Sequence, residues 1–179
     1  MTEFTAYTLE TAKDEAKDIL GNIQAGYGFI PNLFSYMAEA PTTVQAYLQL
    51  NDLLGKTSIP MAQLQVALLA ASKENNCDFC TVAHRAIGKQ SGANTESLNA
   101  LNEGREIADP KDKAIADFTI SVVRNRGFVP EADTQAFLAA GYTQQQILEV
   151  ILVVTIKTLS NYSNHFTKPE ANPELLAML

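Results

Sequence analysis

The sequence contains little positive charge and few groups with special chemistry. It has 13 lysines and arginines against 20 aspartates and glutamates, for a formal net charge of −7, and no tryptophan, two cysteines and two histidines. Lysine and arginine are nowhere clustered. A nucleic-acid groove or an anionic membrane surface needs positive charge gathered on one face. We therefore expect neither nucleic acid nor membrane among the partners of this protein.

Long hydrophobic runs are also missing. The most apolar stretch, Ile147 to Ile156, is too short to span a bilayer and contains Glu149. The first residues, Met1 to Phe4, lack the basic start and apolar core of a secretory signal. The sequence therefore predicts a cytoplasmic location.

No convincing alternation of apolar and polar residues indicates a β-strand, whereas apolar spacings of three and four recur along the chain. We expect an all-α protein with a single domain over residues 1–179 and a loose lead-in at residues 1–10. Prolines, capping residues and glycines delimit the helices. The expected helices are Thr11–Ile23, Pro31–Met37, Pro41–Leu54, Pro60 to the break at Asn75, Cys77–Lys89, Thr95–Leu101, Pro110 to the stop at Gly127, Pro130–Ala140 and Gln144–Asn161.

A weak internal repeat accompanies this pattern. A shift of 84 residues places the apolar positions of Leu64–Ala70 on those of Leu148–Val154. The same shift places Cys80 on Asn164, so the thiols belong to the first copy alone. The repeat predicts two related helical halves.

Both cysteines lie in one short segment with a histidine. In a helix, Cys77 and Cys80 are three residues apart and His84 follows four residues later, so the three side chains share one stripe. In a reducing cytosol, such a pair is more often catalytic or metal-binding than a structural disulfide. A bridge over so short a loop would also stabilise the fold little.

The start of the helix and the histidine both favour ionisation of a thiol. Two asparagines, Asn75 and Asn76, indicate a break, so a new helix begins at or near Cys77. Unpaired amide groups and the helix dipole there favour an anion. His84 is placed to accept the proton of Cys80. The sequence therefore predicts Cys80 as the attacking sulfur and Cys77 as the resolving one.

A thiolate beside a resolving thiol suits the reduction of hydroperoxides. The thiolate becomes a sulfenic acid, the second thiol condenses with it to a disulfide, and an external dithiol restores the pair. Phe79 and the apolar helix after Pro60 favour an organic hydroperoxide. This thiol-dependent hydroperoxide reductase needs no cofactor and no metal.

Three other interpretations remain open at this point. The same cysteines would serve a non-enzymatic thiol-disulfide sensor or switch. Cys77, Cys80, His84 and the distant His165 would together supply the four ligands of a zinc site. Two cysteines on a helix are also ordinary small core residues.

The residues around the thiols resemble a known family. The run from Gln65 to His84, and the upstream segment Gly28–Phe34 followed by Ala40-Pro41, look like the alkylhydroperoxidase AhpD core of the carboxymuconolactone decarboxylase superfamily, in its peroxidase-related subgroup. The resemblance implies an all-helical fold, assembly into trimers or multiples of trimers, and peroxidase activity supported by a lipoyl-type or thioredoxin-like dithiol.

The resemblance also assigns roles to individual residues. It makes Cys80 the peroxidatic cysteine, Cys77 the resolving cysteine and His84 the relay histidine. The family commonly has a glutamate where this chain has Gln65, and its best-known members have a histidine where this chain has Phe79. An amide does not accept a proton as a carboxylate does. Glu149, the repeat counterpart of Gln65, or a water is the expected substitute in the proton relay.

Overall fold

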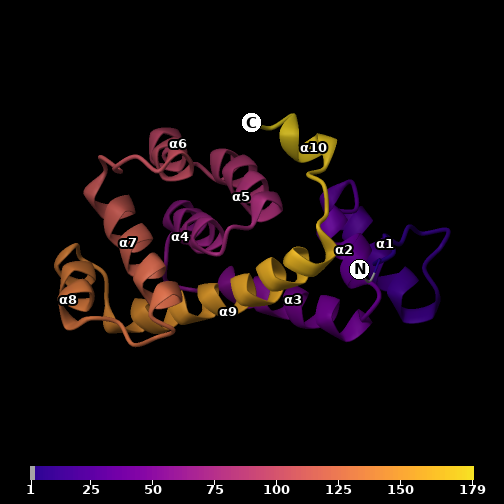
Figure 1. The fold of residues 1–179 in the computed structure, drawn as a ribbon, viewed down its shortest axis with the longest axis horizontal. Helices are drawn as coiled ribbons and strands as arrows, with labels where there is room; N and C mark the ends of the chain where they lie inside the picture. Colours follow the sequence, from indigo (N-terminus) through magenta and orange to yellow (C-terminus); the bar gives the residue numbers. More distant parts are fainter. Residues whose placement is uncertain (1–2) are drawn as a thin grey trace.

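The computed structural model describes residues 3–179, which form helices and connecting loops with no strand (Figure 1). The helices of this part of the chain are α1 (Asp14–Tyr27), α2 (Asn32–Met37), α3 (Pro41–Leu54), α4 (Met61–Glu74), α5 (Asp78–Gln90), α6 (Thr95–Glu103), α7 (Pro110–Arg124), α8 (Glu131–Ala139), α9 (Gln144–Thr167) and α10 (Pro173–Leu176). The all-α prediction is confirmed.

The predicted bounds of several helices were wrong, and one short helix was missed. Helix α1 begins at Asp14 rather than Thr11, and α6 ends at Glu103 rather than Leu101. Helix α1 continues past Ile23 to Tyr27 and ends at Gly28, whose φ of 81° suits glycine. Helix α9 continues past Asn161 to Thr167 and ends at Lys168 in the left-handed region. The short α10 was not predicted. Glycine and asparagine are weak helix breakers when packing supports the helix, so both predicted ends came too early.

The segment predicted as a loose lead-in makes contacts from Tyr7 onward. The backbone N–H of Tyr7 donates to Ser35 O at 3.0 Å, and its hydroxyl donates to Glu39 at 2.6 Å. Leu9 also packs against the apolar cluster of α1 and α2. Residues 1 and 2 of the predicted lead-in lie outside the described residues.

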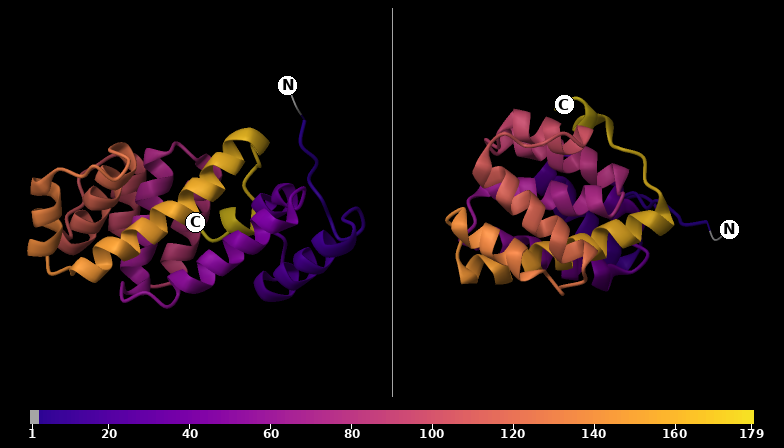
Figure 2. Two further views of the ribbon diagram at one scale, coloured as in Figure 1. Left: turned by 90° about the horizontal axis from the view of Figure 1, so that it is seen from below. Right: turned by 60° about the vertical axis from the view of Figure 1, so that its left-hand side comes forward.

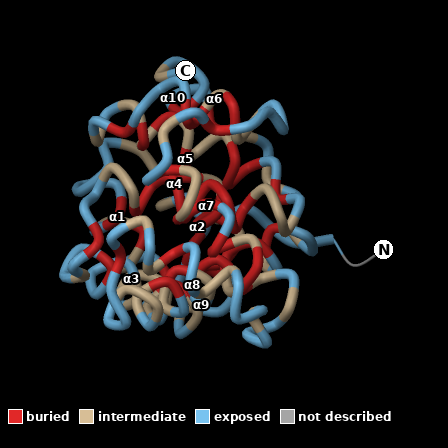
Figure 3. Tube along the Cα trace, turned by 90° about the vertical axis from the view of Figure 1, so that its left-hand side faces the viewer, coloured by how far each residue is buried: buried red, intermediate tan, exposed pale blue. Residues whose placement is uncertain are grey.

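Helix α4 is the centre of the fold, and α9 is its long support. Helix α4 contacts α5, α6, α7 and α9, and its residues from Leu64 to Ser72 are buried on every face. Helix α9 runs along α3 and beneath α4 and α7 (Figures 1 and 2). The buried segments gather around α4 and α7 and along the inner side of α9 (Figure 3). A helix that is apolar all round is placed in a core by the hydrophobic effect.

The apolar interior has two parts. One part surrounds α4, α6, α7 and α9, and the other joins α1, α2 and α3 to the start of α5. Tyr47 packs against both parts. Cys77 and Cys80 belong to the second part, close to the line where the two parts meet.

No single helix among the described residues is both long enough and apolar enough to cross a membrane. Helices α8 and α9 meet the length and composition of a span only when they are taken together across a bend of 114°.

We predict that Gly88→Ala destabilises the protein although it adds a better helix former. A Cβ at Gly88 would lie 2.9 Å from Cδ1 of Leu98, so α5 or the fully buried Leu98 side chain of α6 would have to shift. Overpacking destabilises a core by about 1–3 kcal/mol, and the higher helix propensity of alanine offsets up to about 1 kcal/mol of this. We expect a net loss of roughly 1–2 kcal/mol in the free energy of unfolding, measured with urea.

Gly21→Ala is the matched control, because a Cβ there meets nothing within 4 Å in the middle of α1. We expect it to stabilise the protein by up to about 1 kcal/mol. Equal effects of the two substitutions would contradict the close approach at Gly88.

Candidate functional site

The site begins at the break between α4 and α5. Asn75 caps α4, Asn76 turns the chain with a φ of 55°, and Cys77 is the N-cap of α5. Asparagine enters the left-handed region more readily than most residues, so the two asparagines favour the turn here. The start of the helix at Cys77 is confirmed. Cys80 is the third residue of the first turn, where backbone N–H groups have no partner within the helix.

The two sulfurs share one hydrogen-bond donor. Both cysteines are free and buried. The side-chain amide of Asn164, on α9, donates to Cys77 Sγ at 3.5 Å and to Cys80 Sγ at 3.3 Å. Ser160, one turn earlier on α9, places its hydroxyl 4.0 Å from Cys80 Sγ. Helix α9 therefore holds the thiol pair against the start of α5.

The environment separates the pKa values of the two thiols. A hydrogen bond from Cys77 lowers the pKa of Cys80, burial opposes this, and Lys157 and Ser160 lower the pKa further. The hydrogen bond to Cys80, burial and the charge of Cys80 together raise the pKa of Cys77. Cys80 therefore ionises more readily than Cys77, and Cys80 is the sulfur that the sequence predicted to attack.

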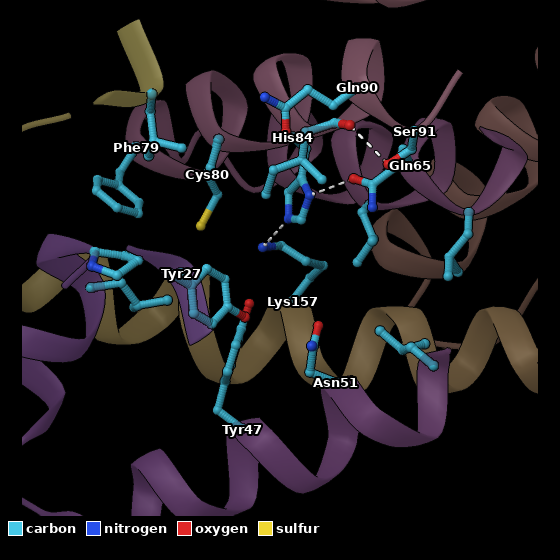
Figure 4. A pocket seen from close by; sticks show the side chains of 18 of the residues that line it. Tyr27, Tyr47, Asn51, Gln65, Phe79, Cys80, His84, Gln90, Ser91 and Lys157 are labelled. Atoms are coloured by element: carbon cyan, nitrogen blue, oxygen red, sulfur yellow. Dashed lines mark hydrogen bonds between the residues drawn. The ribbon is translucent and has the colours of Figure 1, made fainter. Parts of the chain in front are cut away.

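His84 is oriented by two partners, neither of which is a cysteine. Lys157 Nζ lies 2.9 Å from His84 Nε2, and Gln65 Oε1 lies 3.1 Å from His84 Nδ1 (Figure 4). Because an ammonium group only donates and an amide oxygen only accepts, the ring carries its proton on Nδ1. Burial and the charge of Lys157 hold the pKa of His84 well below its usual value. His84 is thus a neutral imidazole.

This arrangement corrects the predicted contact between His84 and the thiol. The helical spacing placed the two residues on one stripe, but both ring nitrogens are occupied by Gln65 and Lys157. Lys157 lies beside the Cys80 sulfur and His84 together (Figure 4), and it lowers the pKa of both groups. The cationic group beside Cys80 is therefore the lysine, which the sequence pattern did not identify.

Lys157 is almost completely enclosed. Its relative exposure is 1%, although lysine is rarely buried without a partner. It follows Val150 and Val153 on the buried face of α9 and precedes Ser160 and Asn164 on the same face. A charged residue at this spacing in an apolar helix was a signal that sequence reasoning had available.

A cavity of about 540 Å³ opens onto the Cys80 sulfur. Aromatic residues from α1, α2, α3 and α5 form much of its wall, and Lys157, His84 and Gln65 form its polar floor (Figure 4). The aromatic lining residues are Tyr27, Phe29, Phe34, Tyr47 and Phe79. In the described part of the chain, the lining contains one lysine and no arginine, aspartate or glutamate.

Two other predicted candidates lie elsewhere. Glu149 accepts hydrogen bonds from Ser58 and Gln145 and does not line the cavity, so the structure gives no support to its predicted part in a relay at Cys80. His165 is exposed and stacks on Tyr162, with ring centroids 5.9 Å apart. Among residues 3–179, no three or more histidine, cysteine, aspartate and glutamate side chains are grouped to hold a metal ion.

Comparison with known proteins shows that this chain shares its fold with solved structures. No protein-family model and no curated protein matches the sequence. Among solved structures, an alkylhydroperoxidase AhpD core, peroxidase-related protein from Ralstonia eutropha JMP134 matches with a TM-score of 0.83 and 23% identity, over 99% of this chain and 97% of that chain. A peroxidase-related protein from Silicibacter sp. TM1040 matches with a TM-score of 0.78 and 20% identity, over 97% and 95%.

A third similar structure carries a different activity. The debrominase Bmp8, as a cysteine-to-alanine variant in complex with 2,3,4-tribromopyrrole, matches with a TM-score of 0.80 and 15% identity, over 99% of this chain and 96% of that chain. Likeness at these identities concerns the fold, and a fold hosts more than one chemistry. The chain has the AhpD-like helical fold.

Proposed function

We propose that the protein is a thiol-dependent hydroperoxide reductase in which Cys80 attacks and Cys77 resolves. The observation that carries this proposal is the thiol pair held by Asn164, with Cys80 lining an apolar cavity and the buried Lys157 beside the attacking sulfur. A thiolate stabilised by a neighbouring cation, next to a second thiol, is typical of redox-active cysteines.

The first step is an attack on the peroxide bond. Cys80 Sγ bonds to the distal oxygen of ROOH, the O–O bond breaks, and the leaving alkoxide takes a proton from Lys157, which regains a proton from solvent. This yields an alcohol and a sulfenic acid on Cys80. Lys157 stabilises the thiolate before the step and the developing alkoxide during it, which is the electrostatic role of a fixed buried cation.

The second step closes the disulfide. Cys77 attacks Cys80 Sγ, the S–O bond breaks, and the hydroxyl leaves as water with the proton of Cys77. An external dithiol then reduces the disulfide by exchange and is itself oxidised. The raised pKa of Cys77 supports this order, because Cys77 keeps its proton until the sulfenic acid has formed.

The apolar cavity favours an organic hydroperoxide over hydrogen peroxide as substrate. Its aromatic wall would bury an alkyl or aryl group, and burial of apolar surface supplies binding energy at about 25 cal/mol per Å². Lipoyl-type or thioredoxin-like dithiols remain the expected reductants, and a homo-oligomer remains the expected assembly.

A second candidate function is reductive dehalogenation of an aromatic halide by the same dithiol. The aromatic cavity wall favours a planar ring, and a debrominase shares the fold. In such a reaction the two thiols are oxidised to a disulfide while the C–Br bond is replaced by C–H and bromide leaves. Release of bromide from a bromopyrrole, driven by a dithiol, would distinguish this function from peroxide reduction.

We predict that removal of the Lys157 charge raises the pKa of Cys80. The rate of Cys80 alkylation by iodoacetamide, followed by mass spectrometry across pH, should reach half its maximum below the value of about 8.5 for free cysteine. In Lys157→Met the thiolate loses its cation, so the midpoint should rise and the rate at pH 7 should fall by about tenfold or more.

Lys17→Met is the control for this measurement, because Lys17 is an exposed lysine of α1 far from the cavity lining. Its alkylation profile should match that of the wild type. An unchanged midpoint in Lys157→Met would show that the lysine does not stabilise the thiolate.

We predict that substitution of each cysteine blocks a different step of peroxide turnover. With cumene hydroperoxide and dihydrolipoamide, Cys80→Ser should lose all protein-dependent consumption. Cys77→Ser should retain one turnover and accumulate a sulfenic acid that dimedone traps. Lys157→Met should slow the first step on the order of 10²-fold, the range of a lost acid and electrostatic group.

Full activity in Cys80→Ser would end the proposal. A disulfide that forms once, without further turnover in the presence of several dithiols, would instead favour the thiol-disulfide switch.

A further inference from the structure

The charge of Lys157 has few compensating partners inside the cavity. Its hydrogen-bond partner His84 is neutral, and the cavity lining described above contains no carboxylate. Asn51 and Gln65 are uncharged amides, and Tyr47 keeps its proton because burial raises its pKa. The Cys80 thiolate is thus the counter-charge of Lys157 in the reduced protein.

Oxidation removes that counter-charge. In the disulfide between Cys77 and Cys80 neither sulfur is ionised, because both sulfur valences are used in covalent bonds. The reduced pair loses two electrons to the peroxide, whose two oxygens leave as an alcohol and a water. Lys157 then remains a buried cation without a charged partner, and an unpaired charge is strongly unfavourable in such a place.

We infer that the oxidised protein binds an apolar monocarboxylate in the cavity, with the carboxylate on Lys157 and the apolar body along the aromatic wall. The inference rests on the thiol pair of the proposed function. The one cation on the cavity floor is balanced by a ligand with one negative charge. The aromatic and aliphatic wall is matched by a ligand with an apolar body. The volume of about 540 Å³ accommodates a medium-chain acid.

Such binding couples the affinity for the ligand to the redox state of the thiol pair. A ligand that prefers the oxidised form stabilises the disulfide, and by linkage the disulfide raises the affinity for the ligand by the same factor. An apolar acid would therefore slow the return of the enzyme to its dithiol form.

The test is calorimetric titration of the full chain with octanoate, with 1-octanol as the uncharged probe of the same length. The oxidised wild type, prepared with diamide and verified by mass, should bind octanoate at least tenfold tighter than the wild type reduced with dithiothreitol. Octanol should bind both forms alike. Oxidised Lys157→Met should lose the preference for octanoate over octanol.

Cys80→Ala tests the charge argument without any disulfide, because it also removes the thiolate beside Lys157. It should bind octanoate as the oxidised wild type does. Cys77→Ser keeps a hydrogen-bond donor beside the Cys80 thiolate and should bind octanoate as weakly as the reduced wild type. Circular dichroism confirms that each variant keeps its helical content.

The inference is overturned if the oxidised protein and Cys80→Ala bind octanoate no tighter than the reduced protein, as would occur if Lys157 simply lost its proton. A disulfide that does not form with diamide contradicts the proposed function instead, and the comparison of Cys80→Ala with Cys77→Ser still decides the anion site.

Discussion

The buried cation of Lys157 is the constraint on which the site depends. A lysine with 1% exposure requires partners that satisfy its donors and balance its charge. His84 supplies an acceptor at 2.9 Å, and the pKa of its ring falls because a second positive charge beside the lysine is unfavourable. The Cys80 thiol supplies the negative charge, and its pKa falls. A single buried positive charge thus favours the deprotonated form of both neighbours, a thiolate at Cys80 and a neutral imidazole at His84.

The same constraint accounts for the amide at position 65. A glutamate there would add a second negative charge beside the Cys80 thiolate, with only one lysine to balance both. With Gln65, the buried group of lysine, thiolate, neutral imidazole and amide has no net charge. Gln65 still accepts the Nδ1 proton of His84 at 3.1 Å and fixes the ring. The departure from the family pattern at Gln65 and the presence of Lys157 are therefore two parts of one electrostatic arrangement.

Much of the local structure could be predicted from local signals, whereas the contacts of the site could not. The two asparagines before Cys77 predicted the break, and the stripe of Cys77, Cys80 and His84 predicted one shared helix face. Helical spacing fixes where Cβ atoms lie but not which partner a ring faces. The partner of His84 comes from α9, 73 residues away, and its position depends on how α9 crosses α5. Only the folded chain brings these two helices together.

Helices α5 and α9 contribute differently to the site, because a turn separates α5 from α4 whereas α9 is continuous. The break at Asn75 and Asn76 creates a helix start, so the thiols sit where unpaired N–H groups favour an anion. Helix α9 continues without a break past the repeat counterpart of this point, and so presents Lys157, Ser160 and Asn164 in successive turns of one face. Asn164, the repeat counterpart of Cys80, lies 3.3 Å from its sulfur. A continuous helix holds its side chains in fixed register, so the charge of Lys157 and the amide donor of Asn164 keep fixed positions against the sulfurs at the break.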